Sequence, residues 1–150
     1  PQSLERGIDY EIHHKDPLER CYIGDSLRLK QILMNLLSNA VKFTAPGGKI
    51  RTEIEEEKRI NGFAIFKISV SDTGIGMTPE YQDRMYQSFS REINTQVNRT
   101  LGSGLGLAIV RQMVDLMGGT ITCESEVFPT LMATNRVFPT GGVMFPIHRL

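Results

Sequence analysis

Residues 25–44 have the sequence DSLRLKQILMNLLSNAVKFT, and the spacing of their apolar side chains predicts a long amphipathic helix. Apolar residues recur three or four positions apart, so they share one face of a helix of about five turns. This face is formed by Leu29, Ile32, Leu33, Leu36, Leu37, Ala40 and Val41. Asp25 is suited to cap the N-terminus, and Pro46 disfavours continuation beyond Ala45. We therefore expect a helix that buries one face against another layer of structure.

Strand patterns lie on both sides of this helix. Alternating apolar residues in Gly7–Ile12 and Lys49–Glu56 predict half-buried strands, and the apolar run Phe63–Ser71 predicts a third. An Asn-Gly pair at 61–62 predicts a hairpin turn between the second and third strands. We expect the charged run Glu55–Arg59 to form the solvated end of this hairpin.

The second half of the chain predicts shorter elements around a long connection. The polar, aperiodic segment Gln87–Ser103 has a length typical of lids and binding loops. The other expected elements are a short helix from Thr78 to Tyr86, an amphipathic helix that opens at 102–107 and ends at Gly118, and strands over Thr120–Glu124 and Val143–Ile147. This order predicts an α+β fold in two layers, with helices packed on one face of a mixed, mostly antiparallel sheet.

Composition narrows the classes of protein. The chain has 150 residues, 17 basic and 17 acidic, with 40% hydrophobic and 23% charged residues, which is typical of one globular domain. A neutral balance argues against a general nucleic-acid binder, and no apolar stretch has the roughly 18 residues of a membrane span. The two cysteines, Cys21 and Cys123, form no CxxC pair and are expected to be reduced. Because the first residue is Pro1, we interpret the chain as a piece of a longer protein.

Polar residues on the first long helix form a first candidate site. Asn35, Asn39 and Lys42 are spaced so that they share one helical face. Amide oxygens suit Mg²⁺, and an ammonium group suits phosphate. The alternative is the solvated side of an amphipathic helix, and this helix alone favours that alternative.

Two glycine-rich turns add candidate sites. Asp72, at the end of a strand, is followed by Gly74 and Gly76, and a carboxylate there could accept a hydrogen bond from a flat, amino-bearing ring. An Asp- and Gly-rich turn of no function would look the same. Three alternating glycines at 102–106 open a helix, and the N–H groups of a helix start bind phosphate. Neither a Walker A loop nor a Rossmann fingerprint is present.

In order and spacing these motifs resemble the ATP-binding domain shared by gyrase-type topoisomerases, heat-shock chaperone ATPases, histidine kinases and mismatch-repair ATPases. Within this superfamily, the residues of the motifs resemble those of sensor histidine kinases. Residues 25–44 resemble the N box, Asp72–Met77 the G1 box, Gly102–Leu107 the G2 box, and Met85–Arg91 a looser F box. The resemblance covers about Ile8–Glu126 and implies the Bergerat-type ATP-binding fold, a two-layer α/β sandwich.

The resemblance also implies roles for individual residues. Asn39 is similar to the asparagine that ligates Mg²⁺, and Asp72 to the aspartate that binds the adenine amino group. The implied catalytic residues are Asn35, Lys42 and Arg91. The implied ATP-binding residues are Asn39, Lys42, Phe43, Asp72, Gly74, Ile75, Gly76, Met77, Gly102, Ser103, Gly104, Leu105, Gly106 and Leu107.

The function implied is transfer of the γ-phosphoryl group of Mg-ATP to a histidine on a separate dimerisation domain in two-component signalling. Hydrolysing branches of the superfamily carry a glutamate where this chain has Asn35, and a neutral amide cannot act as a general base. Two alternatives remain: a degenerate ATP-sensing module without phosphotransfer, and a hydrolysing ATPase.

The expected partners follow from the same resemblance. None of His13, His14 and His148 lies in a His-Glu acceptor motif, so this domain alone should have little activity. We expect a histidine-containing dimerisation domain of the same parent protein and a response regulator receiver domain as partners. We expect no nucleic acid, no direct membrane contact by this domain and a cytoplasmic location, which is compatible with a membrane-anchored parent protein. Two departures stand out: Met144 replaces the usual threonine near adenine, and Val127–Thr140 is unusually long.

Overall fold

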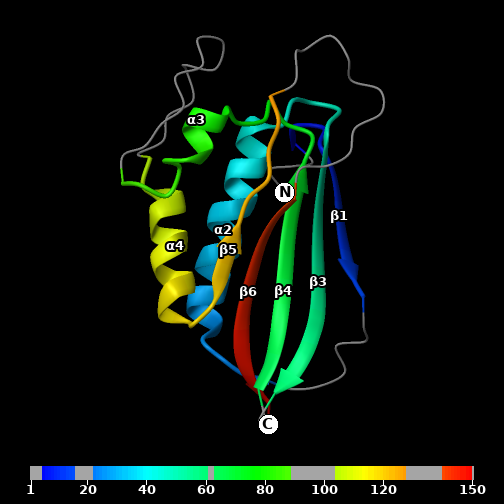
Figure 1. The fold of residues 1–150 in the computed structure, drawn as a ribbon. Coiled ribbons are helices and arrows are strands. Elements are labelled where there is room, and N and C mark those ends of the chain that lie inside the picture. The colour runs from blue at the N-terminus through cyan, green and yellow to red at the C-terminus, as the bar shows by residue number, and fades with distance from the viewer. Residues whose placement is uncertain (1–4, 16–21, 61–62, 89–103, 128–139, 150) are drawn as a thin grey trace.

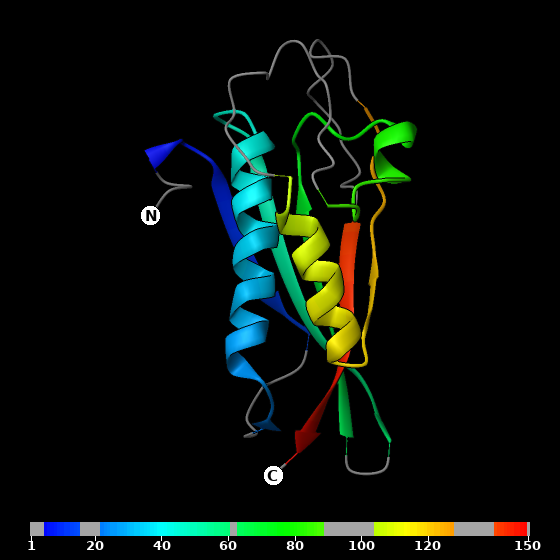
Figure 2. The ribbon, with the colours of Figure 1, turned by 90° about the vertical axis from the view of Figure 1, so that its left-hand side faces the viewer.

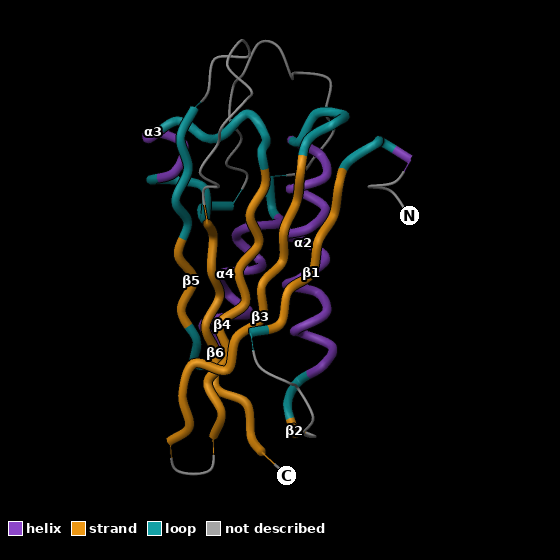
Figure 3. Tube along the Cα trace, turned by 90° about the vertical axis from the view of Figure 1, so that its right-hand side faces the viewer, coloured by secondary structure: helices purple, strands orange, loops and turns teal. Residues whose placement is uncertain are grey.

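The computed structural model of the chain describes residues 5–15, 22–60, 63–88, 104–127 and 140–149. Its elements in chain order are β1 (Asp9–His14), β2 (Tyr22–Ile23), α2 (Ser26–Phe43), β3 (Lys49–Ile60), β4 (Phe63–Asp72), α3 (Pro79–Gln82), α4 (Gly106–Leu116), β5 (Thr120–Thr122) and β6 (Thr140–Arg149). Helices α2 and α4 lie side by side on one face of a sheet, as Figures 1 and 2 show. The opposite face of the sheet carries no helix in the part of the chain that is described (Figure 3).

The sheet is mixed and mostly antiparallel, as the sequence predicts. Its strand order is β1-β3-β4-β6-β2, with β5 paired to β6. Only the β1–β3 pair is parallel among the described strands, and the β3–β4 hairpin is antiparallel. The expected α+β fold with helices on one face is therefore confirmed.

The core lies between the helices and the middle of the sheet. Ile32 of α2 and Val110 and Val114 of α4 are buried against Ala64, Phe66 and Ile68 of β4. A smaller cluster joins Ile8, Ala40 and Ile50 near the other end of α2. Each fully buried aliphatic side chain contributes about 1.5–3 kcal/mol. This packing fixes α2 and α4 relative to the end of β4.

Helix α2 begins and ends where local chemistry predicts. Asp25 Oδ1 accepts a hydrogen bond from the Arg28 N–H at 2.9 Å, which is an N-cap. At the other end the Thr44 N–H donates to the Ala40 carbonyl at 3.0 Å, and Thr44 itself is extended. The helix stops at Phe43, two residues before the expected end, because the residues before Pro46 leave the helical region.

Several boundaries differ from the prediction. Strand β3 continues through the charged run to Ile60, with a register shift between Glu56 and Lys58. Its charges are compatible with a strand because Lys15 Nζ pairs with Glu55 at 2.9 Å and the Tyr22 hydroxyl donates to Glu56 at 2.5 Å.

The other differences from the prediction concern the bounds of α3, β5 and β6 and the presence of β2. Helix α3 is only one turn, and it gives way to irregular turns before Tyr86. Strand β5 ends at Thr122, whereas β6 begins at Thr140, earlier than predicted, because it pairs with β4 along most of its length. Strand β2 was not predicted, because two residues carry no period.

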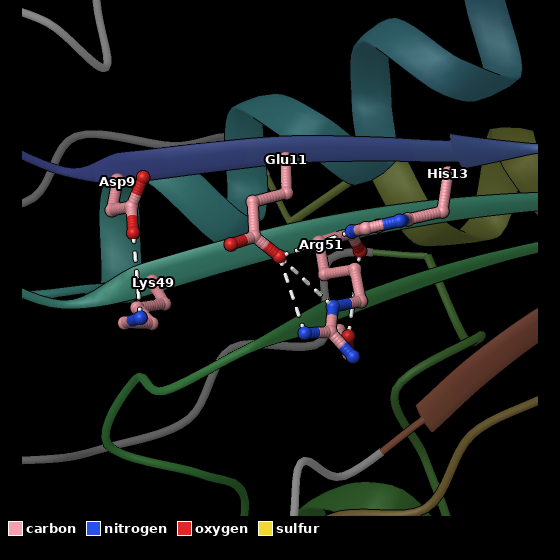
Figure 4. Close-up of polar contacts among 6 residues, drawn as sticks. Asp9, Glu11, His13, Lys49 and Arg51 are labelled. Carbon is pink, nitrogen blue, oxygen red and sulfur yellow. Dashed lines mark hydrogen bonds and ion pairs between the residues drawn. The ribbon is translucent and has the colours of Figure 1, made fainter.

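The outer face of β1 and β3 carries charged side chains that pair with each other (Figure 4). Lys49 Nζ lies 3.4 Å from Asp9, and Glu11 Oε2 accepts from His13 Nε2 at 3.1 Å and from Arg51 at 3.1 and 3.3 Å. The hydrogen bonds from His13 and Arg51 lower the pKa of Glu11. Exposed pairs of this kind add little stability, but charge on an edge strand disfavours pairing with another chain.

Candidate functional site

One face of α2 meets the start of α4. Asn35, Asn39 and Lys42 are all half-buried on one continuous helix, as predicted. Asn35 Nδ2 donates to the Gln31 carbonyl at 3.1 Å, and Asn35 Oδ1 lies toward Gly106, where an added Cβ would approach it to 3.2 Å. The structure therefore brings the amide oxygen of Asn35 to the first residue of α4.

Helix α4 begins without a side-chain cap. Leu105 occupies the N-cap position, where no side-chain hydrogen bond is made, and Gly104 before it has a φ of +71°. The positive end of the helix dipole therefore faces the α2 surface at Asn35. Of the other predicted residues in this motif, Leu107 is half-buried inside α4, and Gly102 and Ser103 lie outside the described residues.

A cation and an aromatic ring occupy the last turn of α2. Lys42 Nζ lies 4.9 Å from the centroid of the Phe43 ring, within the range of a cation–π contact. Phe43 is 37% exposed, which makes its ring accessible to a ligand. Arg91, which was predicted to be catalytic together with Asn35 and Lys42, lies outside the described residues.

The turn after β4 is tied to the end of α2. Asp72 Oδ1 accepts from the Gly74 N–H at 2.8 Å, and the Ile75 N–H points to the Phe43 carbonyl at 3.4 Å. A Cβ on Gly74 would lie 2.6 Å from Asp72 Oδ1 and 2.8 Å from the Phe43 carbonyl oxygen. Glycine is therefore required at 74, where the Asp72 carboxyl and the Phe43 backbone come together.

Gly76 is required for a different reason. Its φ is +75°, and an added Cβ would lie 1.7 Å from the Glu126 carbonyl oxygen. The turn thus packs backbone against backbone on the segment that follows β5.

The environment of the Asp72 carboxyl favours acceptance of a hydrogen bond from a bound ligand. Burial raises the pKa of its carboxyl above the ordinary value of 3.8, while the Gly74 N–H and the Thr44 hydroxyl oppose that rise. Thr44 is 1% exposed, and its hydroxyl lies near the carboxyl without completing a hydrogen bond of normal geometry. A carboxylate so poorly solvated gains strongly from a donor on a bound ligand.

Sequence reasoning missed the groups behind this turn. Gln82 and Ser125 bind the backbone of Met77, as described below, and neither belongs to a recognisable pattern. Cys123, half-buried and free as expected, lies near Asp72, and burial raises the pKa of its thiol to about 11. Tyr86 lies beside it, and burial raises the pKa of its phenol to about 12.

The expectation that Met144 stands near the adenine-binding aspartate is wrong. Met144 on β6 pairs with Lys67 of β4 and Thr120 of β5, whereas Thr140 pairs with Ser71, next to Asp72. Met144 therefore lies several residues along the sheet from Asp72, at a rise of about 3.3 Å per residue. Residues 128–139, before β6, lie outside the described residues, and the position of Met144 follows from the pairing of β6 with β4 and β5.

Comparison with known proteins agrees with this geometry. The sequence signature of the histidine kinase-, DNA gyrase B- and HSP90-like ATPases matches residues 24–142. The chain belongs to this ATPase family. The matched range contains the asparagine face of α2, the turn after β4 and the start of α4.

Curated relatives of this ATPase domain are sensor kinases. The chain is 47% identical over 126 residues to the circadian input-output histidine kinase CikA of Synechococcus elongatus, covering 83% of this chain and 16% of that protein. It is 39% identical over 127 residues to the autoinducer 2 sensor kinase/phosphatase LuxQ of Vibrio vulnificus, covering 84% of this chain and 15% of that protein. The signal transduction histidine-protein kinase BarA of Escherichia coli is 36% identical over 124 residues. The chain therefore spans about one seventh of the length of these relatives.

Solved structures confirm the fold of a histidine kinase catalytic domain. Full-length ShkA in complex with AMPPNP matches 100% of this chain and 28% of that one, with a TM-score of 0.76 and 30% identity. The nucleotide-free catalytic domain of histidine kinase ThkA matches 97% of this chain and 84% of that one, with a TM-score of 0.71 and 25% identity. The ATPase domain of this chain thus has the architecture of the ATP-binding domain of sensor histidine kinases. No helix in its described part is both long and apolar enough to cross a membrane.

Proposed function

We propose that this chain binds Mg-ATP and transfers its γ-phosphoryl group to a histidine on a separate dimerisation domain of the parent protein. The observation that carries the proposal is the arrangement around α2. One end of this helix contacts, through Phe43, the turn formed by Asp72–Met77, which we call the Asp72 turn. The middle of the helix faces the start of α4 through Asn35. A single rigid helix thus joins a group that can read a base to a helix start that can hold phosphate.

Adenine binds at the Asp72 turn. The carboxylate accepts a hydrogen bond from the exocyclic amino group, and the glycines at 74 and 76 let the backbone approach the flat ring. Ile75 and Met77 line the same turn, and the exposed ring of Phe43 lies beside the nucleotide.

The phosphates bind between α2 and the start of α4. Lys42 supplies positive charge, and Gly104, Leu105, Gly106 and Leu107 form the start of α4, where the positive end of the helix dipole favours phosphate. Gly102, Ser103 and Arg91 complete this proposal from the segment outside the described residues.

The donor set fits a sparsely held Mg²⁺. Asn39, with Asn35 one turn earlier, offers neutral amide oxygens, and no group of three or more His, Cys, Asp or Glu side chains that could hold a metal occurs in the described part of the chain. Mg²⁺ is commonly held by one or two protein oxygens together with substrate phosphates and water. The ion would neutralise charge on the β- and γ-phosphates.

Transfer is favoured over hydrolysis because Asn35 cannot activate water. The acceptor imidazole forms a P–N bond as the bond from the γ-phosphorus to the β,γ-bridging oxygen breaks, and ADP leaves. Catalysis by this chain then rests on positioning and charge neutralisation. The displacement of Met144 from the site removes one argument for a degenerate ATP sensor.

The partners proposed are domains that this chain does not contain. Relatives are full-length sensor kinases of which this chain covers 13–16%. We place the acceptor histidine on a dimerisation domain of the parent and the next phosphoryl acceptor on a response regulator receiver domain. We also propose a cytoplasmic location for this domain, because ATP is supplied there.

The test is phosphoryl transfer in trans. The chain is mixed with a dimerisation domain that carries the acceptor histidine and with γ-labelled ATP. We expect acid-labile label on the dimerisation domain, lost with Asn39→Ala in the chain. ATP binding without label on the acceptor would favour the sensor, and rapid phosphate release by the chain alone would favour the hydrolase.

A further inference from the structure

Two side chains hold the last residue of the Asp72 turn. The Met77 N–H donates to Ser125 Oγ at 2.9 Å, and the Met77 carbonyl accepts from Gln82 Nε2 at 2.9 Å. The same Gln82 Nε2 donates to the Ser125 carbonyl at 2.8 Å. Gln82 lies at the end of α3, and Ser125 lies on the segment after β5. We call Gln82 and Ser125 the Met77 clamp.

The clamp holds the Met77 end of the Asp72 turn, whereas β4 holds the end at Asp72. The first half of the turn is tied to Asp72 by the Gly74 N–H. The second half passes through Gly76, whose backbone packs on Glu126, one residue beyond Ser125. Figure 1 shows the segment after β5 rising beside the turn that leads to α3. The clamp therefore fixes how closely the glycine turn packs on its support.

All three hydrogen bonds are well formed and involve half-buried groups. Both backbone groups of Met77 are satisfied by side chains and not by a strand or helix ladder. Removing one side chain would leave a backbone group partly buried and unpaired, which the turn can relieve only by moving. Movement there shifts the backbone of Gly74–Met77 relative to Asp72.

We infer that Gln82 is a positioning residue for adenine: through Met77 it holds the glycine turn in the shape that accepts the base. This inference rests on the proposed function, because it assumes that adenine binds at the Asp72 turn. Gln82 touches no phosphate in this scheme. Its loss should therefore weaken ATP and ADP equally.

The first experiment measures nucleotide affinity of the chain by calorimetry. Gln82→Met keeps the length of the side chain and removes both donors, and Gln82→Glu keeps its shape while placing an acceptor against two carbonyls. We expect ATP and ADP to bind about fivefold more weakly to Gln82→Met, the size of one ordinary hydrogen bond, and more weakly still to Gln82→Glu. Gln112→Met on the exposed side of α4 is the matched control and should bind as the parent sequence does.

The second experiment separates positioning from general stability. Hydrogen exchange of the peptide covering 74–78 should speed up in Gln82→Met, while peptides from the core of α2 and β4 keep their protection. Gln82→Met and Ser125→Ala act on the same residue, so their combined loss of affinity should fall well short of the product of about 25-fold expected for independent changes. Ser125→Thr retains the acceptor and should restore most of the affinity lost in Ser125→Ala.

The outcomes distinguish this inference from the proposed function. If the chain binds ATP and Asp72→Asn weakens binding more than tenfold, but Gln82→Met matches Gln112→Met, the positioning role is wrong and the function stands. Fully multiplicative losses in the double variant would also overturn it. If the parent sequence does not bind ATP at all, the proposed function fails first.

Discussion

Asp72 is a carboxyl group in a place where burial opposes its charge. A carboxyl group buried in this way, with a raised pKa, is typical of a functional site. The sequence could predict this residue because Asp-x-Gly-x-Gly is a local pattern. It could not predict that this carboxyl is buried, nor that the Thr44 hydroxyl and the Cys123 thiol lie near it, because both residues are remote from Asp72 in sequence.

We expect Asp72→Asn to stabilise the nucleotide-free chain while weakening ATP binding. The amide keeps the acceptor for the Gly74 N–H and removes the buried charge, so the Tm should rise by a few degrees at pH 7. Loss of a charged acceptor for the adenine amino group should cost about 1.5–3 kcal/mol of binding, more than tenfold in Kd. Thermal unfolding and calorimetry measure the two effects.

The pH dependence checks the cause. Because the pKa of Asp72 is raised in the folded chain, its favourable contribution is complete below the ordinary value of 3.8 and is lost as the pH rises through the folded pKa. The advantage of Asp72→Asn should therefore shrink as the pH falls from 7 toward 4. An advantage that stays constant with pH would contradict the role of buried charge.

Gly76 and Gly47 provide a matched pair of glycines with positive φ. Gly47 has a φ of +80° and open space around an added Cβ, whereas the Cβ at Gly76 would overlap the Glu126 carbonyl. Gly47→Ala should cost only the backbone penalty, about 1–2 kcal/mol. Gly76→Ala should cost about 2–5 kcal/mol, because overpacking adds to the same penalty.

Urea unfolding of both alanine variants measures this difference. Gly47→Ala should also bind ATP as the parent sequence does, since Gly47 lies outside the turn after β4. Equal destabilisation of the two variants would show that the close approach to Glu126 has no energetic weight.

At the scale of elements, local signals were predictable and long-range pairings were not. Helix α2 begins at the residue that Asp25 caps, because capping involves neighbours along the chain. The extent of β3 and β6 depends on partners far away in the sequence. The same reason explains the error over Met144, since register is set across strands and not along one.

The cap of α2 gives a prediction at this scale. Asp25→Ala removes the acceptor for the Arg28 N–H and should destabilise the chain by about 0.5–2 kcal/mol. Asp25→Asn keeps an acceptor and should cost much less, since the exposed Asp25–Arg28 ion pair at 3.2 Å contributes little. Urea unfolding at low and moderate salt measures both variants. A loss in Asp25→Asn as large as in Asp25→Ala would assign the effect to the ion pair.

At the scale of the whole molecule, the scaffold and the site occupy different regions of the same two layers. The main core joins α2, α4 and β4 through Ile32, Val110 and Phe66, whereas the site lies where the end of β4, the end of α2 and the start of α4 converge. The sequence could predict both layers because apolar periodicity reports burial. It could not predict their junction, where Asn35 meets Gly106, because that contact joins residues 71 positions apart.

This separation predicts that stability and ligand binding vary independently in a core variant. Val114 is fully buried near the far end of α4 from the site, and Val114→Ala should cost about 2–3 kcal/mol through lost burial and a residual cavity. Mg-ATP at about 100 times its Kd should stabilise any folded chain with an intact site by about 2.7 kcal/mol. The Tm of Val114→Ala should therefore start lower and rise with Mg-ATP by nearly the same amount as that of the parent sequence. Asp72→Asn should show the reverse, a higher starting Tm and about half the rise or less at the same nucleotide concentration. If Val114→Ala lost the nucleotide-dependent rise while remaining folded, the core and the site would be coupled, and α4 could not be regarded as a rigid support for phosphate.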